Sequence, residues 1–225
     1  MTDILERRVV DKPVELRAAP EGGSGPGILT GYGAVFNSTS RDLGGWFEEI
    51  DPGAFGPVGE LDLATHIRVI CRAEHDSRLL LGTTDALTLR LFVDEIGLRY
   101  EVDLPDTGAG RDVATLARRG DYRHSSFAFH MLRYEDAEWR EDADGRLIRR
   151  VMRAIVSDVA PVADPAYWAA DTQMQRAFDL DEVRAALAPE PAKPGEAEAA
   201  VRSAAALMTR ETHPALVART RKRGI

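Results

Sequence analysis

The stretch GDYRHSSFAFHM, residues Gly120–Met131, decides how this chain folds. After a glycine that can end a helix, large apolar side chains alternate with small or polar ones, which is typical of a β-strand with one face in the core. The apolar face comprises Phe127, Phe129 and Met131. Ser126 and Ala128 therefore lie on the opposite, less crowded face, whereas Ser125 points the same way as the phenylalanines.

Short runs of the same kind continue on both sides of this stretch. Glycine, aspartate, asparagine and proline break them, as expected for strands joined by turns. The runs are ILTGYGAVF (28–36), WFEEI (46–50), IRVIC (67–71), LTLRLFV (87–93), LRYEVDL (98–104), SFAFHMLRY (126–134) and LIRRVMRAIV (147–156). The segment GRDVATLARRG (110–120) instead has a helical spacing of apolar residues. We therefore expect an α+β fold, mainly an antiparallel β barrel or sandwich with a few helices.

The composition changes along the chain and suggests three parts. Residues 1–27 form an N-terminal arm, because a Gly/Ser/Pro cluster marks its end. This arm can include a short edge strand. Residues 28–175 are the folded domain. Residues 176–225 form a weakly packed tail, with good helix formers on both sides of the Pro-rich linker APEPAKPGE (188–196).

Composition and charge exclude several classes of protein. The 225 residues include 44% hydrophobic and 29% charged ones, which suits a single globular domain. The net charge of −8 argues against a nucleic-acid partner. A lone cysteine, Cys71, rules out an internal disulfide and a cysteine-rich zinc site. No apolar run approaches the roughly 18 residues of a membrane helix, and the first residues are too charged for a secretion signal, so we expect a soluble, cytosolic protein.

The common cofactor and hydrolase motifs are absent from the sequence. It has no phosphate-binding glycine loop, no dinucleotide fingerprint, no paired-histidine zinc motif, no EF-hand and no GxSxG elbow. We therefore predict no cofactor and no metal.

Three polar positions remain as candidates for chemistry. His75, in AEHDS after a strand-like run, is a candidate general base, and Asp76 could orient it only awkwardly because adjacent strand residues face opposite ways. Ser126 lies beside a small residue, which leaves room for a substrate carbonyl. Asp158 interrupts an apolar run and so needs a donor. That donor is either a histidine or an arginine such as Arg153, and physical grounds alone favour the arginine.

In this order and spacing, several segments resemble one family. They are GYGAVFN, DLGGWFEEIDPGAF, the HD of AEHDS, LLGTTDALTLRLFVDEIGLRYEVDLPDT, RRGDYRHSSFAF and SDVAPVADPAY. The family is the prohead maturation proteases of tailed bacteriophages, serine peptidases related in fold to the herpesvirus assemblins. The resemblance covers roughly residues 28–168.

The resemblance implies a function and a catalytic site. Its histidine falls on His75, its nucleophile on Ser126 and its acidic residue on Asp158; the related herpesvirus enzymes use a second histidine in the third role, for which His124 or His130 can be proposed. It implies cleavage of the major capsid protein and of the protease itself, inside the immature capsid in the host cytoplasm. Because the Pro-rich linker and the Ala-rich tail after residue 188 have weak packing signals, we assign self-cleavage or tethering to the shell to them.

Two other functions are compatible with the same residues. One is a catalytically inactive scaffold or assembly factor with this fold. The other is a metal hydrolase that uses His66, His75 and the carboxylates of Glu74 or Asp76, although neighbouring strand residues make poor joint ligands.

Overall fold

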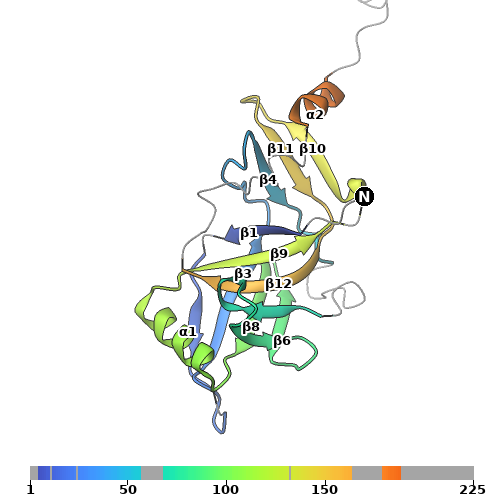
Figure 1. The fold of residues 1–225 in the computed structure, drawn as a ribbon. Helices are drawn as coiled ribbons and strands as arrows, with labels where there is room; N and C mark the ends of the chain where they lie inside the picture. The colour runs from blue at the N-terminus through green and yellow to red at the C-terminus, as the bar shows by residue number, and fades with distance from the viewer. Residues whose placement is uncertain are drawn as a thin grey trace, which may run out of the picture. The chain divides into compact units, whose positions relative to one another are not determined.

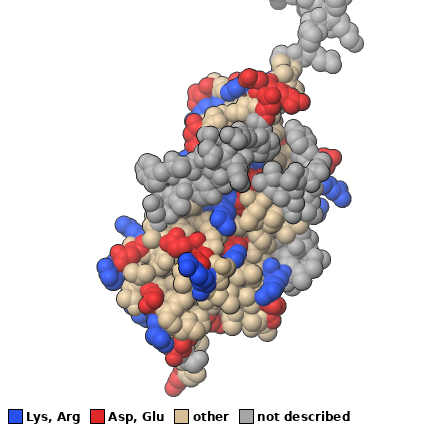
Figure 2. Space-filling view, viewed as in Figure 1, with Lys and Arg blue, Asp and Glu red and all other residues tan. Residues whose placement is uncertain are grey.

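Over the residues that it describes, the computed structural model consists mostly of β-strands in three sheets, with two α-helices (Figure 1). It describes residues 5–10, 12–23, 25–56, 68–131, 133–163 and 179–188. Over this part of the chain no helix is long and apolar enough to span a membrane. On the face shown in Figure 2, acidic and basic side chains are mixed over the residues that are described.

The largest sheet has five strands and carries the candidate residues. In spatial order they are β1 (Glu6–Val10), β9 (His124–His130), β12 (Ile155–Val162), β5 (Ile70–Arg72) and β6 (Leu80–Thr83). Neighbouring strands are antiparallel except β12 and β5, which run parallel. The central strand, β12, is therefore flanked by the strand of Ser126 and by the strand that leads to His75.

A four-stranded antiparallel sheet packs on one face of the five-stranded sheet. It consists of β2 (Glu15–Arg17), β3 (Ile28–Val35), β8 (Gly97–Asp103) and β7 (Leu89–Val93), in this order. Figure 1 shows β9 and β12 running across β3 and β8. The contact is close because β3 has a glycine there: a Cβ on Gly33 would lie 3.3 Å from both Phe127 and Val159. The rings of Phe127 and Phe129 stack at 5.0 Å in this core.

The third sheet has three strands. They are β10 (Ala137–Glu141), β11 (Leu147–Val151) and β4 (Trp46–Ile50), and β11 runs parallel to β4. Helix α2 (Leu180–Leu187) packs Leu180 and Val183 against a small apolar cluster around the buried Trp46 and Leu147. This helix, expected in a weakly packed tail, therefore contacts the domain.

Helix α1 (Gly108–Arg119) confirms the helix predicted between strands. The Thr107 side chain caps its first turn by accepting a hydrogen bond from the Gly110 N–H, and Gly120 ends it in the left-handed conformation with φ of 82°. The described residues also form two short 3-10 turns, Ala73–His75 and Tyr134–Asp136.

The expected mostly-β architecture is confirmed, but two details differ. The pairings among the described strands give open sheets and not a closed barrel. The run of residues 147–156, predicted as one strand, is two strands of different sheets, β11 and β12. It breaks because the N–H groups of Met152 and Arg153 both bind the Asp136 carbonyl, and that of Ala154 binds Ala54.

The predicted arm, residues 1–27, contributes β1 and β2 to two sheets. Most of the predicted tail, residues 176–225, lies outside the described residues. The two predicted boundaries between these three parts stay predictions.

Candidate active site

Ser126 is held on β9 with its side chain away from the main core. The neighbouring Ser125 points the other way, as the alternation predicts, and its hydroxyl lies 3.0 Å from the Tyr100 hydroxyl between the two sheets. Burial raises the pKa of Tyr100 well above its usual range, so this phenol stays neutral. Ser125 is thus engaged in the core, and Ser126 is the serine that faces the candidate site.

His75 reaches Ser126 from a short turn after β5. Its Nε2 lies 2.6 Å from Ser126 Oγ. Glu74 and His75 both have positive φ, 54° and 56°, which is an unfavourable conformation for residues other than glycine. The Asp76 N–H closes the turn by donating to the Ala73 carbonyl. The backbone is therefore strained where it presents the imidazole.

Asp158 holds the other nitrogen of the same imidazole. His75 Nδ1 lies 2.9 Å from Asp158 Oδ1. Because a carboxylate oxygen only accepts, Nδ1 carries the hydrogen and Nε2 is left to accept the Ser126 hydroxyl. The two ring nitrogens of His75 therefore link Ser126 to Asp158 in one continuous series of contacts.

A β-bulge brings Asp158 to this face. The register of β12 on β9 pairs Val156 with Phe129 and Asp158 with Ala128, so Ser157 is the extra residue. Regular pairing would have turned the Asp158 side chain into the apolar core. The Ser157 hydroxyl instead donates to the Ala128 carbonyl at 3.2 Å, and Asp158 shares the face of Ser126.

The second donor to Asp158 is Arg72, and the expectation of Arg153 is wrong. Arg72 Nε donates to Asp158 Oδ2 at 2.5 Å, and Arg72 Nη2 pairs with the same oxygen. The sequence predicted a histidine or an arginine as the donor, and Asp158 contacts one of each, His75 and Arg72. Arg72 is the last residue of β5, beside β12, whereas Arg153 lies in the break before β12 and uses its N–H for Asp136. Sequence spacing gave no signal for Arg72, because the parallel pairing of β5 with β12 brings it near.

The three candidate side chains are almost completely buried. Ser126 and Asp158 are each 1% exposed, and the His75 side chain is 8% exposed. A buried site strengthens the interactions between charges and hydrogen-bonding groups. The arrangement can move a proton from a hydroxyl to an imidazole that a carboxylate stabilises.

The remaining acidic and histidine candidates do not take part in the contacts between Ser126, His75 and Asp158. Asp76 pairs with Arg78 at 2.6 Å, which lowers the pKa of Asp76 to about 2, so it does not orient His75. Glu74 accepts the Ala163 N–H at 2.7 Å. His124 and His130 are the two end residues of β9, and the contact with Ser126 comes from His75.

The metal-hydrolase alternative finds no support in the described part of the chain. No group of three or more potential ligands gathers there. Glu74 and Asp76 are used by Ala163 and Arg78 respectively, and His66 lies outside the described residues.

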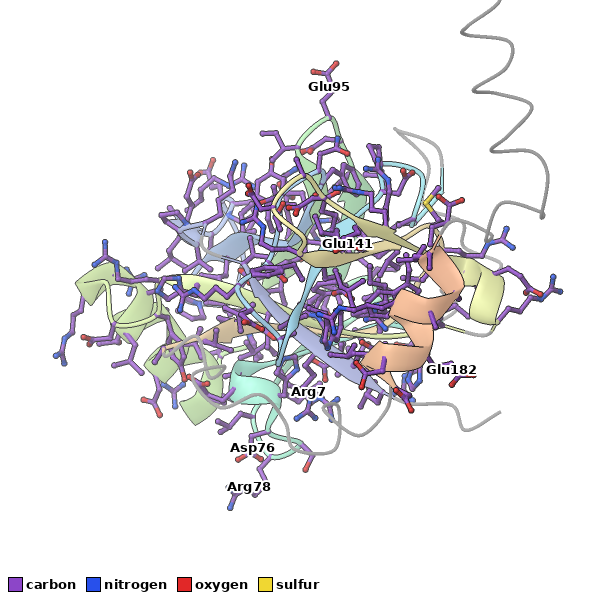
Figure 3. All side chains as sticks on the ribbon, turned by 90° about the horizontal axis from the view of Figure 1, so that it is seen from above. Arg7, Asp76, Arg78, Glu95, Glu141 and Glu182 are labelled. Atoms are coloured by element: carbon purple, nitrogen blue, oxygen red, sulfur yellow. The ribbon has the colours of Figure 1, made fainter. Side chains whose placement is uncertain are left out.

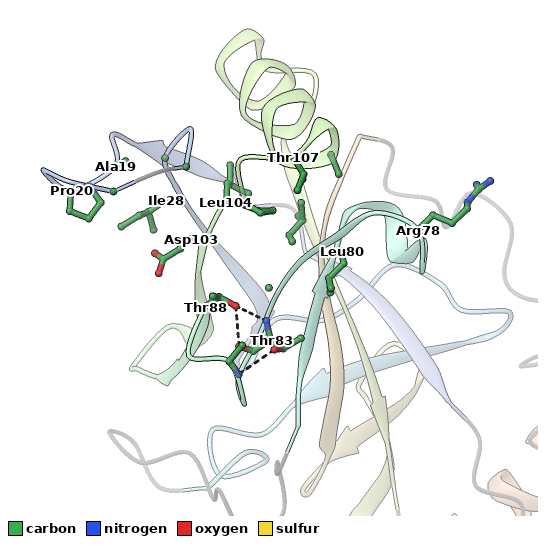
Figure 4. Close-up of a pocket in the computed structure, with 18 residues that line it drawn as sticks. Ala19, Pro20, Ile28, Arg78, Leu80, Thr83, Thr88, Asp103, Leu104 and Thr107 are labelled. Carbon is green, nitrogen blue, oxygen red and sulfur yellow. Dashed lines mark hydrogen bonds between the residues drawn. The ribbon is translucent and has the colours of Figure 1, made fainter.

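A pocket of about 790 Å³ lies beside the turn that follows His75 (Figure 4). Its walls come from Arg78, from β6, from the end of β8 and from the start of α1. Near its floor the Thr83 N–H donates to the Thr88 hydroxyl at 3.0 Å. The three candidate side chains do not line this pocket.

A serine whose hydroxyl contacts a histidine, which in turn contacts an aspartate, is the arrangement of the serine hydrolases. Comparison with protein families narrows this class. The family model for the caudovirus prohead serine protease matches residues 12–185, so the chain belongs to this family. The comparison with curated proteins found no match, and neither did the comparison with solved structures.

Proposed function

We propose that this chain is an endopeptidase of phage capsid maturation with Ser126 as nucleophile, His75 as general base and Asp158 as the group that orients His75. The observation that carries the proposal is the pair of contacts on one imidazole, 2.6 Å to Ser126 and 2.9 Å to Asp158. The family supplies the substrate class. The four-stranded sheet packs on the five-stranded sheet, which is compatible with a sandwich fold related to the assemblins. This fold relationship is part of the proposal.

The reaction follows from the positions of the protons. His75 Nε2 takes the hydroxyl proton as Ser126 Oγ attacks the peptide carbonyl, and Asp158 stabilises the imidazolium that forms. The imidazolium then gives its proton to the leaving amine, which leaves an acyl-enzyme. Water attacks the acyl group while His75 accepts a proton from it, and the imidazolium then gives this proton to Ser126 Oγ as the bond to the acyl group breaks and the carboxyl product leaves. Neither a metal nor a cofactor enters these steps.

The substrates in this proposal are the major capsid protein, whose scaffolding segment is removed, and the protease chain itself. Cleavage takes place inside the immature capsid, in the cytoplasm of the host. The residues after α2 are the proposed site of self-cleavage, because the Pro-rich linker 188–196 separates them from the packed helix.

Co-expression with the capsid protein tests the proposal. Wild type should trim the capsid protein and yield a shortened protease by mass spectrometry of purified shells, whereas Ser126→Ala should leave both chains intact. Asp158→Asn should slow trimming by about 10⁴-fold, because the imidazole loses the carboxylate that fixes its tautomer.

The neighbouring serine provides the matched control. Ser125→Ala should retain labelling by a fluorophosphonate probe, and Ser126→Ala should abolish it. Because Ser125→Ala leaves the Tyr100 hydroxyl without its partner, we expect a loss of about 1–3 kcal/mol in the free energy of unfolding. Absence of labelling of the wild type in assembled particles, or labelling that persists in Ser126→Ala, would instead favour the inactive scaffold.

A further inference from the structure

The face of the five-stranded sheet that carries Ser126 extends onto the edge strand β1. The antiparallel register places Val9 opposite Ser126 and Arg7 opposite Ala128. Opposite residues of an antiparallel pair project to the same side. Arg7 therefore lies on the face of Ser126, whereas the intervening Arg8 points to the other face.

Arg7 has no partner for its guanidinium among the described residues. No hydrogen bond or ion pair of this group is present there, and its Nε is buried without a hydrogen-bond partner. Its neighbour Arg8 is different, because it pairs with Glu6 at 2.6 Å and with Glu48 at 2.5 Å. A partly buried guanidinium without a carboxylate is costly to the folded protein, and it is ready to bind an anion.

Two carboxylates that lie on the same face or the same side of the molecule as Arg7 already have other partners. Asp158 projects to the same face, on the other side of Ala128, and both of its oxygens are held by the imidazole and guanidinium described above. Figure 3 shows Arg7 on the same side of the molecule as the turn of Asp76 and Arg78. There Asp76 is held by two nitrogens of the Arg78 side chain, at 3.0 and 2.6 Å.

We propose that Arg7 is a specificity residue that binds an aspartate or glutamate side chain of the substrate close to the scissile bond. The inference rests on the proposed function, in which Ser126 is the nucleophile. Diagonal neighbours on two paired strands are about 7–8 Å apart, and an extended peptide advances about 3.3 Å per residue. An acidic side chain two or three residues from the bond that Ser126 attacks therefore falls within reach of Arg7.

The chemistry selects a carboxylate over other groups. A guanidinium presents parallel N–H donors that match the two oxygens of a carboxylate, and the pairing is stronger where water is excluded. Arg7 also precedes residues 12–185, which the family model matches, so the family match assigns this residue no role.

A peptide library cleaved by the full chain tests the inference. Wild type should cut preferentially where aspartate or glutamate occupies one position within three residues of the bond. Arg7→Gln should lower kcat/KM for the best acidic peptide by about ten- to a hundredfold, mainly through KM, and leave its neutral counterpart within about threefold. Arg7→Glu should shift the preference at that position to lysine or arginine.

Two controls separate this inference from the proposed function. Arg111→Gln makes the same change of charge on α1, where Arg111 is exposed and pairs with Asp106, and should keep the acidic preference. Fluorophosphonate labelling of Ser126 reports the catalytic site without a peptide and should proceed at the wild-type rate in Arg7→Gln. A wild type that is labelled but shows no acidic preference, or a preference that both Arg7 variants retain, overturns the inference alone. A wild type that is never labelled overturns the proposed function.

Discussion

Asp158 divides its two oxygens between two donors, and this division explains how a carboxylate can lie in a mostly apolar sheet. Oδ1 lies next to the imidazole of His75, and Oδ2 accepts from Arg72. A buried carboxylate that lost one donor would turn or protonate, and the imidazole would lose its fixed orientation. In the proposed mechanism Arg72 is therefore a positioning residue that acts through Asp158.

This role predicts a defect in turnover for Arg72→Gln. We expect kcat on a peptide substrate to fall about ten- to a hundredfold, the equivalent of one charge-assisted hydrogen bond, with KM nearly unchanged. Arg72→Lys should recover part of the loss because it keeps a charged donor. Arg68→Gln is the matched control, since Arg68 is exposed and pairs with Asp85. An unchanged kcat in Arg72→Gln, or a change confined to KM, would show that Asp158 does not depend on Arg72.

The sequence predicts part of this site at the level of single residues. Alternation along β9 correctly separates Ser125 from Ser126, because strand periodicity is a local property. The need of Asp158 for a donor also follows from its apolar surroundings. The identity of that donor cannot be predicted from the sequence, because Arg72 and Asp158 are 86 positions apart in the chain and a parallel strand pairing brings them together.

At the level of elements, a glycine on β3 allows the two packed sheets to approach beneath the candidate site. A Cβ on Gly31 would lie 2.4 Å from Ser125 Oγ and 2.6 Å from the Tyr100 hydroxyl. Real Cβ atoms do not come so close to buried groups, so any larger residue must displace the Ser125 hydroxyl or the Tyr100 phenol, and the tight packing passes that displacement on to β9. The position of Ser126 thus depends on a residue of the facing sheet.

We therefore expect Gly31→Ala to lower the free energy of unfolding by about 1–3 kcal/mol, measured by urea denaturation. The same shift of β9 should slow fluorophosphonate labelling of Ser126. Gly108→Ala is the matched control, since a Cβ there would have no neighbour within 4 Å and the position lies at the start of α1. Equal stability of the two variants would mean that the sheets can separate at no cost.

The strands show where periodicity stops being informative. Helix α1 was predictable because its apolar spacing and its final glycine lie within the segment itself. The run of residues 147–156 reads as one strand, yet it divides at 152–154 because distant carbonyls, those of Asp136 and Ala54, capture its N–H groups. The bulge at Ser157 is equally invisible in the sequence, although it decides which way Asp158 points.

At the level of the whole molecule, four buried charges join the five-stranded to the three-stranded sheet. They are Glu6 and Arg8 on β1, Glu48 on β4 and Arg149 on β11. Arg149 is fully buried, donates from Nε to Glu48 at 2.9 Å and from Nη1 to Glu6 at 3.0 Å, and lies 4.6 Å from the centre of the Trp46 ring. Binary patterning cannot predict such a network, because each member resembles an outward-facing residue of its own strand.

The network predicts that the stability of the folded protein falls in acid. Burial by itself raises the pKa of Glu48, but the charges of Arg149 and Arg8 outweigh it and hold this pKa below its ordinary value. The unfolded chain therefore takes up the proton at a higher pH than the folded protein. The stability contributed by Glu48 is complete above its unfolded pKa, about 4.3, and is lost as pH falls through the lower folded pKa.

Urea denaturation over a pH series, comparing wild type with Glu48→Gln, measures this contribution. At neutral pH the variant should lose about 3–5 kcal/mol, because Arg149 and Arg8 keep only one carboxylate between them. Below about pH 4.3 the wild type should lose up to about 1.4 kcal/mol per pH unit more than the variant, so the two curves converge. Asp103→Asn, which breaks the more exposed pair with Arg90, should cost at most about 1 kcal/mol at neutral pH. Parallel curves for wild type and Glu48→Gln would mean that Glu48 titrates alike in both states, and the buried charges would then not account for the acid sensitivity.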